Sequence, residues 1–251
     1  MLEEAGYTVK LQNPRQVRRL AEGMGTSCKT DKVDARVLAD TATLCGKNAP
    51  RSKEREALSD ISRAVERLKR DKANGLKQIQ VPGMSAVVVK SIKRLSTTLT
   101  KEIKTLEKAF VGKVKSSSLA TKYKNILTVP SIGPVAARTL VCELAEDLNP
   151  WSVRKISVYA GVAPLDDSSG KKVKPARVPK HKNVHLKAAL YMPALNAVQR
   201  QPWATKAYAK LRAKGLNHQQ AMIPIMHKLL FHVVAVIKRG SAWEAEPPKK
   251  T

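Results

Sequence analysis

The chain has 251 residues, with 47 lysines and arginines against 20 aspartates and glutamates, and a formal net charge of +27. Its hydrophobic fraction of 43% is enough to build a core, so the charge does not mark a disordered polycation. Such a surplus must be offset by a polyanion, and nucleic acid is favoured over an acidic membrane because the basic residues are spread along the whole chain.

The cysteines and the apolar segments narrow the class of protein further. Cys28, Cys45 and Cys142 are too few and too scattered for a disulfide framework or a zinc cluster, which favours a reducing compartment. The first ten residues do not resemble a signal peptide, and no apolar run reaches the ~18–20 residues that a membrane span needs. The most apolar stretch, residues 229–238, contains His232 and is interpreted as a core helix. We expect a cytoplasmic protein, associated with the nucleoid when bound to DNA.

The first segment, residues 1–50, predicts the remnant of an α/β domain. Three elements are expected in it: a strand over residues 6–14, a short helix over 15–24 and a helix over 31–44. Pro14 closes the strand, and Gly46 and Pro50 end the last helix.

Residues 51–118 predict an antiparallel helical hairpin or a coiled-coil arm. Aliphatic residues recur there at helical spacing: Leu58, Ile61, Val65 and Leu68, then Ile92, Leu95, Leu99, Ile103, Leu106 and Phe110. The sequence VPGMS at 81–85 separates the two helices, and KSSS at 115–118 is interpreted as a linker. Most charged residues of this segment are expected on a solvated face.

A second compact region is expected over residues 119–240, mostly helical, followed by a disordered tail over 241–251. Trp151, Trp203 and Trp243 are isolated in the sequence and are interpreted as core anchors rather than base-stacking platforms. The fold class is therefore mostly α, with an α/β remnant at the start.

The sequence VPSIGPVAARTLV, residues 129–141, has two interpretations. Pro134 suits a first helical position, and Gly133 before it would let a phosphate backbone approach the unpaired N–H groups of a helix N-terminus. A helix–hairpin–helix motif binds the backbone of nucleic acid in this way. An ordinary turn between core helices fits equally well.

The sequence LDDSSGKKVK, residues 165–174, places two serines beside lysines. A serine there could attack a phosphodiester, because the cations would hold the negative charge that builds up on phosphorus. From spacing alone, a plain loop is the better interpretation.

Asp31 and Asp34 also have two interpretations. Three positions apart on a helix, both carboxylates can face one Mg²⁺ ion, although two-metal chemistry usually needs three or four carboxylates. Alternatively Asp31 is the N-cap and Asp34, at the third helical position, lies near the positive end of the helix dipole. The physics of the sequence alone favours capping.

Four segments, in order, resemble one family. Residues 6–40, GYTVKLQNPRQVRRLAEGMGTSCKTDKVDARVLAD, resemble the end of the RuvC-like, RNase H-type domain of the DEDD transposases of the insertion-sequence one-ten type, relatives of the Piv invertase. The segments LTVPSIGPVAARTLVCEL, YAGVAPLDDSSG and HKNVHLKAALYMPAL with AMIPIMHKLLFHVVAVI resemble its C-terminal transposase domain. The resemblance covers nearly the whole chain.

The resemblance implies specific residue roles. Asp31 and Asp34 would be the last two acidic ligands of a Mg²⁺ site. Ser169, in preference to Ser168, would form the covalent link to DNA. The expected DNA-binding residues are Gly133, Lys171, Lys172, Lys180, Lys182 and Lys187. The resemblance further implies a structured guide RNA and a homo-oligomer, a dimer or a tetramer.

Three departures from the family pattern lead to expectations of their own. The first aspartate and the glutamate of the metal site have no counterparts here, so we expect an N-terminally truncated, impaired enzyme that binds nucleic acid with little strand transfer alone. Lys182 stands where the family usually has glycine, and Lys187 where it usually has arginine, whose bidentate fork lysine lacks.

Two rival functions remain at this point. A basic helical protein that coats or scaffolds nucleic acid would keep every activity after Ser169→Ala or Asp31→Asn. A helix–hairpin–helix nuclease or repair factor would cut DNA without forming a covalent protein–DNA product.

Overall fold

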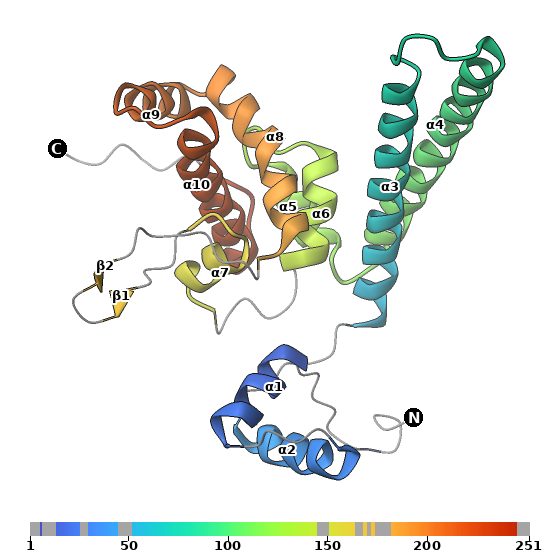
Figure 1. Cartoon of the computed structure of the whole chain (residues 1–251). Helices are drawn as coiled ribbons and strands as arrows, with labels where there is room; N and C mark the ends of the chain where they lie inside the picture. Colours follow the sequence, from blue (N-terminus) through green and yellow to red (C-terminus); the bar gives the residue numbers. More distant parts are fainter. Residues whose placement is uncertain are drawn as a thin grey trace. The chain divides into compact units, whose positions relative to one another are not determined.

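The computed structural model describes residue 6 and residues 14–25, 30–44, 52–144, 151–163, 168–169, 172–173 and 182–244. The chain divides into two compact units, Met1–Lys53 and Glu54–Thr251. The described residues are mostly α-helical, which confirms the helical part of the expected fold class (Figure 1).

Among its described residues, the first unit contains two helices that pack on each other, α1 (Pro14–Gly23) and α2 (Asp31–Leu44). Ala21 and Val37 are the buried apolar residues among those described in this unit. Both helices were expected, and α2 has the predicted bounds. Most of the predicted strand over 6–14 lies outside the described residues, so that expectation stays open.

The second unit begins with the expected arm, formed by α3 (Lys53–Gln78) and α4 (Ala86–Lys115). The helices run antiparallel (Figure 1), because Lys69 of α3 lies against Glu107 of α4 while Gly75, further along α3, lies against Ile92, nearer the start of α4. The apolar face of α4 is less buried than its spacing predicts. Ile103 and Phe110 are buried, but Leu95 is 58% exposed.

The rest of the second unit, where the structure describes it, is a bundle of six helices with one short hairpin. The helices are α5 (Ala120–Leu127), α6 (Pro134–Leu144), α7 (Val153–Tyr159), α8 (Val184–Arg200), α9 (Pro202–Ala213) and α10 (His218–Arg239). The hairpin pairs β1 (Ser168–Ser169) with β2 (Lys172–Val173) in antiparallel fashion. In Figure 1, α10 lies beside α8 and α9, which it contacts together with α5 and α7.

Helix α10 forms the centre of the core. Among the described helices it alone is long and apolar enough to cross a membrane, yet more than half of its most apolar stretch is buried in the bundle. Asn217 and Gln220 form a capping box at its start, and Gly240, at φ 72°, ends it in the left-handed conformation that favours glycine. The interpretation of residues 229–238 as a core helix is confirmed.

Candidate functional site

The start of α2 carries the two aspartates that the sequence singled out. Thr30 Oγ1 accepts a hydrogen bond from the backbone N–H of Val33, 3.3 Å away, as an N-cap residue does. Asp31 and Asp34 are therefore the first and fourth residues of the helix, and the expectation that Asp31 is the N-cap is wrong. A hydroxyl-bearing residue directly before Asp31 provides the capping oxygen instead.

These aspartates remain available for another role. Asp31 is exposed and Asp34 is partly exposed, both in the first turn of α2. Their hard carboxylate oxygens are of the kind that Mg²⁺ prefers, and their spacing puts them on one face of the helix. They fit two positions of a magnesium site. Within the part of the chain that the structure describes, no three acidic, histidine or cysteine residues cluster as a metal site would need.

The expected serine loop contains an antiparallel hairpin. Ser169 pairs with Lys172 and Ser168 with Val173. The backbone register thus sets Ser169 directly opposite a lysine. Lys171 and Lys180 lie outside the described residues, so their expected DNA contacts are not tested by the fold.

The N-terminus of α8 brings two of the expected DNA-binding residues together. Asn183 caps the helix by accepting the backbone N–H of Leu186 at 3.0 Å. Burial lowers the pKa of Lys187, and the nearby charge of Lys182 lowers it further. Two like charges therefore share a helix N-terminus, where the dipole also favours an anion.

Close packing holds Lys182 in place. Gly161 has a φ of 68°, and a Cβ atom there would lie 2.9 Å from Cβ and 2.6 Å from Cδ of Lys182. The stem of the lysine thus covers a glycine that both the backbone conformation and the contact require. This contact follows α7 directly and links it to the start of α8.

A polar network beneath the start of α8 was not foreseen from the sequence. The Asn183 amide donates to Glu143 Oε2 at 2.8 Å and to the Tyr159 hydroxyl at 2.9 Å. Arg63 of α3 donates to the other oxygen of Glu143 at 3.4 Å, and Glu143 is only 7% exposed. The network therefore connects α3, α6, α7 and α8.

A second part of the network pairs histidine with glutamate. His185 Nδ1 lies 2.7 Å from Glu66 Oε2, and Thr139 donates to the other oxygen of Glu66 at 3.0 Å. His185 and Thr139 lie 119 and 73 positions from Glu66 in the sequence. Sequence spacing therefore gave no indication of these contacts. The structure makes His185 a hydrogen-bond partner of Glu66.

Glu107 joins three helices through two hydrogen bonds. Its Oε1 accepts from Lys69 Nζ at 2.7 Å and from Arg138 Nη1 at 3.3 Å. Burial raises the pKa of Glu107, but the hydrogen bonds and charges of Lys69 and Arg138 together outweigh it and hold that pKa below its ordinary value of 4.5.

This lowered pKa makes stability depend on pH. A depressed carboxyl pKa stabilises the folded state above the unfolded pKa, and that contribution is lost as the pH falls through the folded pKa. We expect Glu107→Gln to reduce the free energy of unfolding at pH 7, with the difference from wild type shrinking below pH 4.5. Urea denaturation at several pH values measures this, with exposed Glu102→Gln as the control. A pH-independent difference would contradict the assignment.

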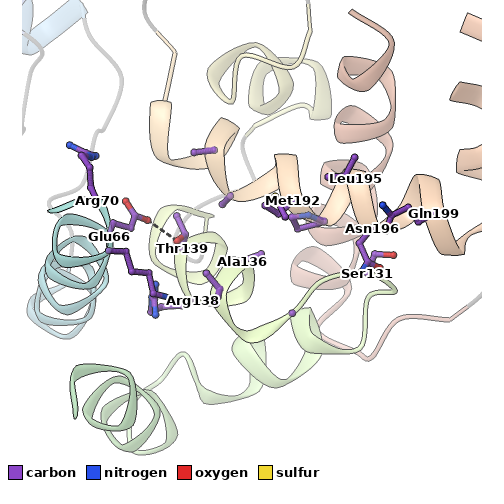
Figure 2. A pocket seen from close by; sticks show the side chains of 16 residues that line it. Glu66, Arg70, Ser131, Ala136, Arg138, Thr139, Met192, Leu195, Asn196 and Gln199 are labelled. Atoms are coloured by element: carbon purple, nitrogen blue, oxygen red, sulfur yellow. Dashed lines mark hydrogen bonds between the residues drawn. The ribbon is translucent and has the colours of Figure 1, made fainter. Parts of the chain in front are cut away.

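An open groove of about 630 Å³ lies between α3, the start of α6 and α8. Figure 2 shows Glu66 and Arg70 on the α3 side and Met192 and Asn196 on the α8 side. Gly133 lines it, and a Cβ atom there would meet nothing within 4 Å. The glycine is therefore not needed for internal packing, and it leaves the backbone at the start of α6 open from outside.

The turn that precedes α6 is strained at one residue. Ser131 has a φ of 70°, which is uncommon for a residue other than glycine, and its buried hydroxyl has no hydrogen-bond partner among the described residues. Pro134 is the first residue of α6, as predicted. The groove thus has a strained turn and an accessible helix start at one end.

Cys142 is not a nucleophile in this unit. The residue is 1% exposed, and burial raises the pKa of its thiol to about 11. The thiolate that would react is therefore nearly absent near neutral pH.

Comparison with known proteins identifies the family. The model of the transposase IS116/IS110/IS902 family matches residues 123–209, and the model of DEDD transposases of the IS110 type matches residues 1–81. The first match contains α6, the hairpin and α8, and the second contains Asp31 and Asp34.

Individual relatives agree with these matches. The pilin gene-inverting protein of Moraxella bovis is 25% identical over 95% of this chain and 75% of its own length. The uncharacterized 43.6 kDa protein of insertion element IS110 from Streptomyces coelicolor is 23% identical over 68% of this chain, which spans only 42% of that protein. The transposase of IS1328 from Yersinia enterocolitica is 24% identical over 68% of this chain and 58% of its own length. The chain therefore belongs to the DEDD transposase family of the IS110 type.

Proposed function

We propose that this chain acts in DNA strand transfer, in transposition or site-specific recombination, with Ser169 as the nucleophile and with little activity on its own. Family membership supports the class of reaction. The structural observation that carries the proposal is the paired charge of Lys182 and Lys187 at the N-terminus of α8, which a bound phosphate would relieve.

Strand transfer by this mechanism requires a serine nucleophile and cations around the attacked phosphate. Ser169 Oγ would form a bond to phosphorus as the bond to a DNA oxygen breaks, the serine losing its proton and the leaving oxygen gaining one. The negative charge that builds up on phosphorus is stabilised by nearby lysines. The register that sets Ser169 opposite Lys172 supports this role.

Asp31 and Asp34 would hold Mg²⁺, which when bound supplies electrostatic stabilisation of the transferred phosphate. We propose them as ligands because of their oxygen donors, their shared helix face and their exposure at the start of α2. The expectation that this polypeptide alone gives little strand transfer stays a prediction. A plasmid recombination assay tests it, and clear Mg²⁺-dependent product would contradict it.

The groove beside α6 is proposed as a second contact with DNA. Its open Gly133, the unpaired N–H groups at the start of α6, and Arg70 from α3 suit a phosphate backbone. The strained turn at Ser131 is of the kind that gathers at functional sites. A structured guide RNA and a homo-oligomer are proposed as partners on the strength of the resemblance to the family.

Lys187 gives a direct test of DNA binding. We expect Lys187→Gln to weaken binding to duplex DNA and to lower the slope of log K against log salt by about 0.9, the value for one lost phosphate contact. Lys187→Arg should keep the slope, because arginine keeps the charge. Fluorescence anisotropy over a range of salt concentrations measures both.

Lys206, exposed on α9, is the matched control for this experiment. Lys206→Gln removes the same charge from the chain but none from the start of α8. If the two glutamine variants changed the salt slope equally, the effect would come from net charge, and the proposed contact at Lys187 would be withdrawn.

A further inference from the structure

A second cavity, of about 220 Å³, lies against α9, α10 and the turn between α5 and α6. It is separate from the groove beside α8, and three of its lining residues carry aromatic rings. The residues that matter for its chemistry are Pro130, Gln201, Trp203, Lys228, His232 and Trp243. Two of the three tryptophans, far apart in the sequence, thus line one cavity.

The rings of this cavity contact one another in fixed geometry. The centroid of His232 lies 6.4 Å from that of Trp203, with the planes at 67°, and 6.1 Å from that of Trp243, at 87°. Trp243 Nε1 also donates to His232 Nδ1 at 3.5 Å. All three rings are partly exposed, so they are not fully enclosed anchors of the core.

Backbone contacts hold Trp243 at the cavity. The left-handed Gly240 ends α10, and its carbonyl accepts a hydrogen bond from the Asn125 amide at 2.9 Å. The backbone N–H of Trp243 donates to Thr128 Oγ1 at 2.7 Å. Because α5 and the turn after it fix this segment, the aromatic wall is organised before any ligand arrives.

The polar groups of the cavity decide the class of ligand. Lys228 Nζ lies 4.5 Å from the centroid of the Trp203 ring, so a cation already occupies one approach to that ring and would repel a cationic ligand. Gln201 is the N-cap residue of α9, but its side chain makes no capping hydrogen bond to that helix. A side-chain amide of this kind can hydrogen-bond to the edge of a nucleobase. A flat ring with a polar edge and an attached anion fits this combination.

We propose that this cavity binds an unstacked nucleobase of single-stranded nucleic acid. Charge complementarity supports this occupant, because Lys228 stands at the cavity in a chain of net charge +27. The turn before α6 connects the two sites, since Pro130 lines the cavity while Ser131 and Gly133 line the groove. A strand whose backbone lies at the turn can place one base in the cavity. Strand transfer at Ser169 does not require such a site.

The test uses the full chain and two ten-nucleotide probes, oligothymidylate and a strand of equal length without bases. The intact strand is expected to bind more tightly than the abasic strand. Trp203→Ala should weaken binding of oligothymidylate about 5- to 150-fold, the range for one lost base–aromatic stack, and change binding of the abasic strand less than about twofold. Trp151→Phe, at a tryptophan outside the cavity that packs on Tyr159, is the control and should change neither.

Further variants cover the case in which Trp203→Ala fails to fold, as thermal unfolding would show. Trp203→Phe should keep most of the preference for the strand with bases, and Gln201→Ala should reduce it in a folded protein. Comparing oligothymidylate with oligouridylate decides whether DNA or RNA is the better source of the base. Equal affinity of the wild-type chain for the intact and abasic strands would overturn the proposal. So would equal losses for both strands in Trp203→Ala and Gln201→Ala.

Discussion

Ser169→Ala is expected to abolish any covalent protein–DNA product that this chain forms, a loss of at least about a thousandfold, because no bond to phosphorus forms without the nucleophile. The measurement uses labelled DNA from the sequences that flank the gene encoding the chain. The protein is incubated with this DNA and Mg²⁺, and the mixture is analysed after boiling in detergent. Only a covalent link survives that treatment. Non-covalent binding should be unchanged in the variant, since the positive charge is unchanged.

Ser168→Ala is the matched control, because Ser168 precedes Ser169 in β1 and pairs with Val173 rather than with Lys172. It should keep the product. If Ser168→Ala lost the product and Ser169→Ala kept it, the nucleophile would be the neighbouring serine. If both variants kept it, the proposed serine chemistry would be wrong. If the DNA were cut but no covalent protein–DNA product formed, a nuclease activity would be favoured instead.

The helices of this protein are predictable because their signals are local. The bounds of α2 and the break between α3 and α4 at VPGMS follow from apolar periodicity and from Gly and Pro punctuation within a few turns. Periodicity does not say what covers a helix face, however. Leu95 lies in phase with Ile103 and Phe110, yet it is exposed, because the bundle packs on the later part of α4.

Among the site residues too, those with a local signal in the sequence were expected, and those that depend on long-range contacts were not. The lysines at the start of α8 were expected, because they stand in a recognisable motif. The pairing of Glu66 with His185 was not, because it depends on how the arm docks on the bundle. The tryptophans were interpreted as isolated anchors, and the sequence contains no pattern that unites Trp203 with Trp243. Such long-range contacts follow only from the tertiary fold.

The largest effect on stability is expected from Asn183, because its side chain both caps α8 and enters the buried network. Asn183→Ala would lose a cap worth about 1 kcal/mol and remove the amide that donates to Glu143 Oε2. Loss of a donor to a buried acceptor costs about 1–3 kcal/mol more. The free energy of unfolding should fall by about 2–4 kcal/mol in urea denaturation. Asn217→Ala, at the cap of α10, should cost only about 1 kcal/mol, because among the described residues the Asn217 side chain makes only its capping hydrogen bond.

Aspartate at the same two positions separates the cap from the network more sharply. Asn217→Asp keeps a good capping oxygen near the positive end of α10, so this variant should be close to wild type in stability. Asn183→Asp keeps the cap but replaces the amide donor with a carboxylate beside Glu143, and Glu143 is 7% exposed. It should be destabilised despite its intact cap, because like charges meet where water is scarce. If Asn183→Asp were as stable as wild type, the contact between Asn183 and Glu143 would contribute nothing to the fold, and apolar packing would have to account for how α6, α7 and α8 are joined.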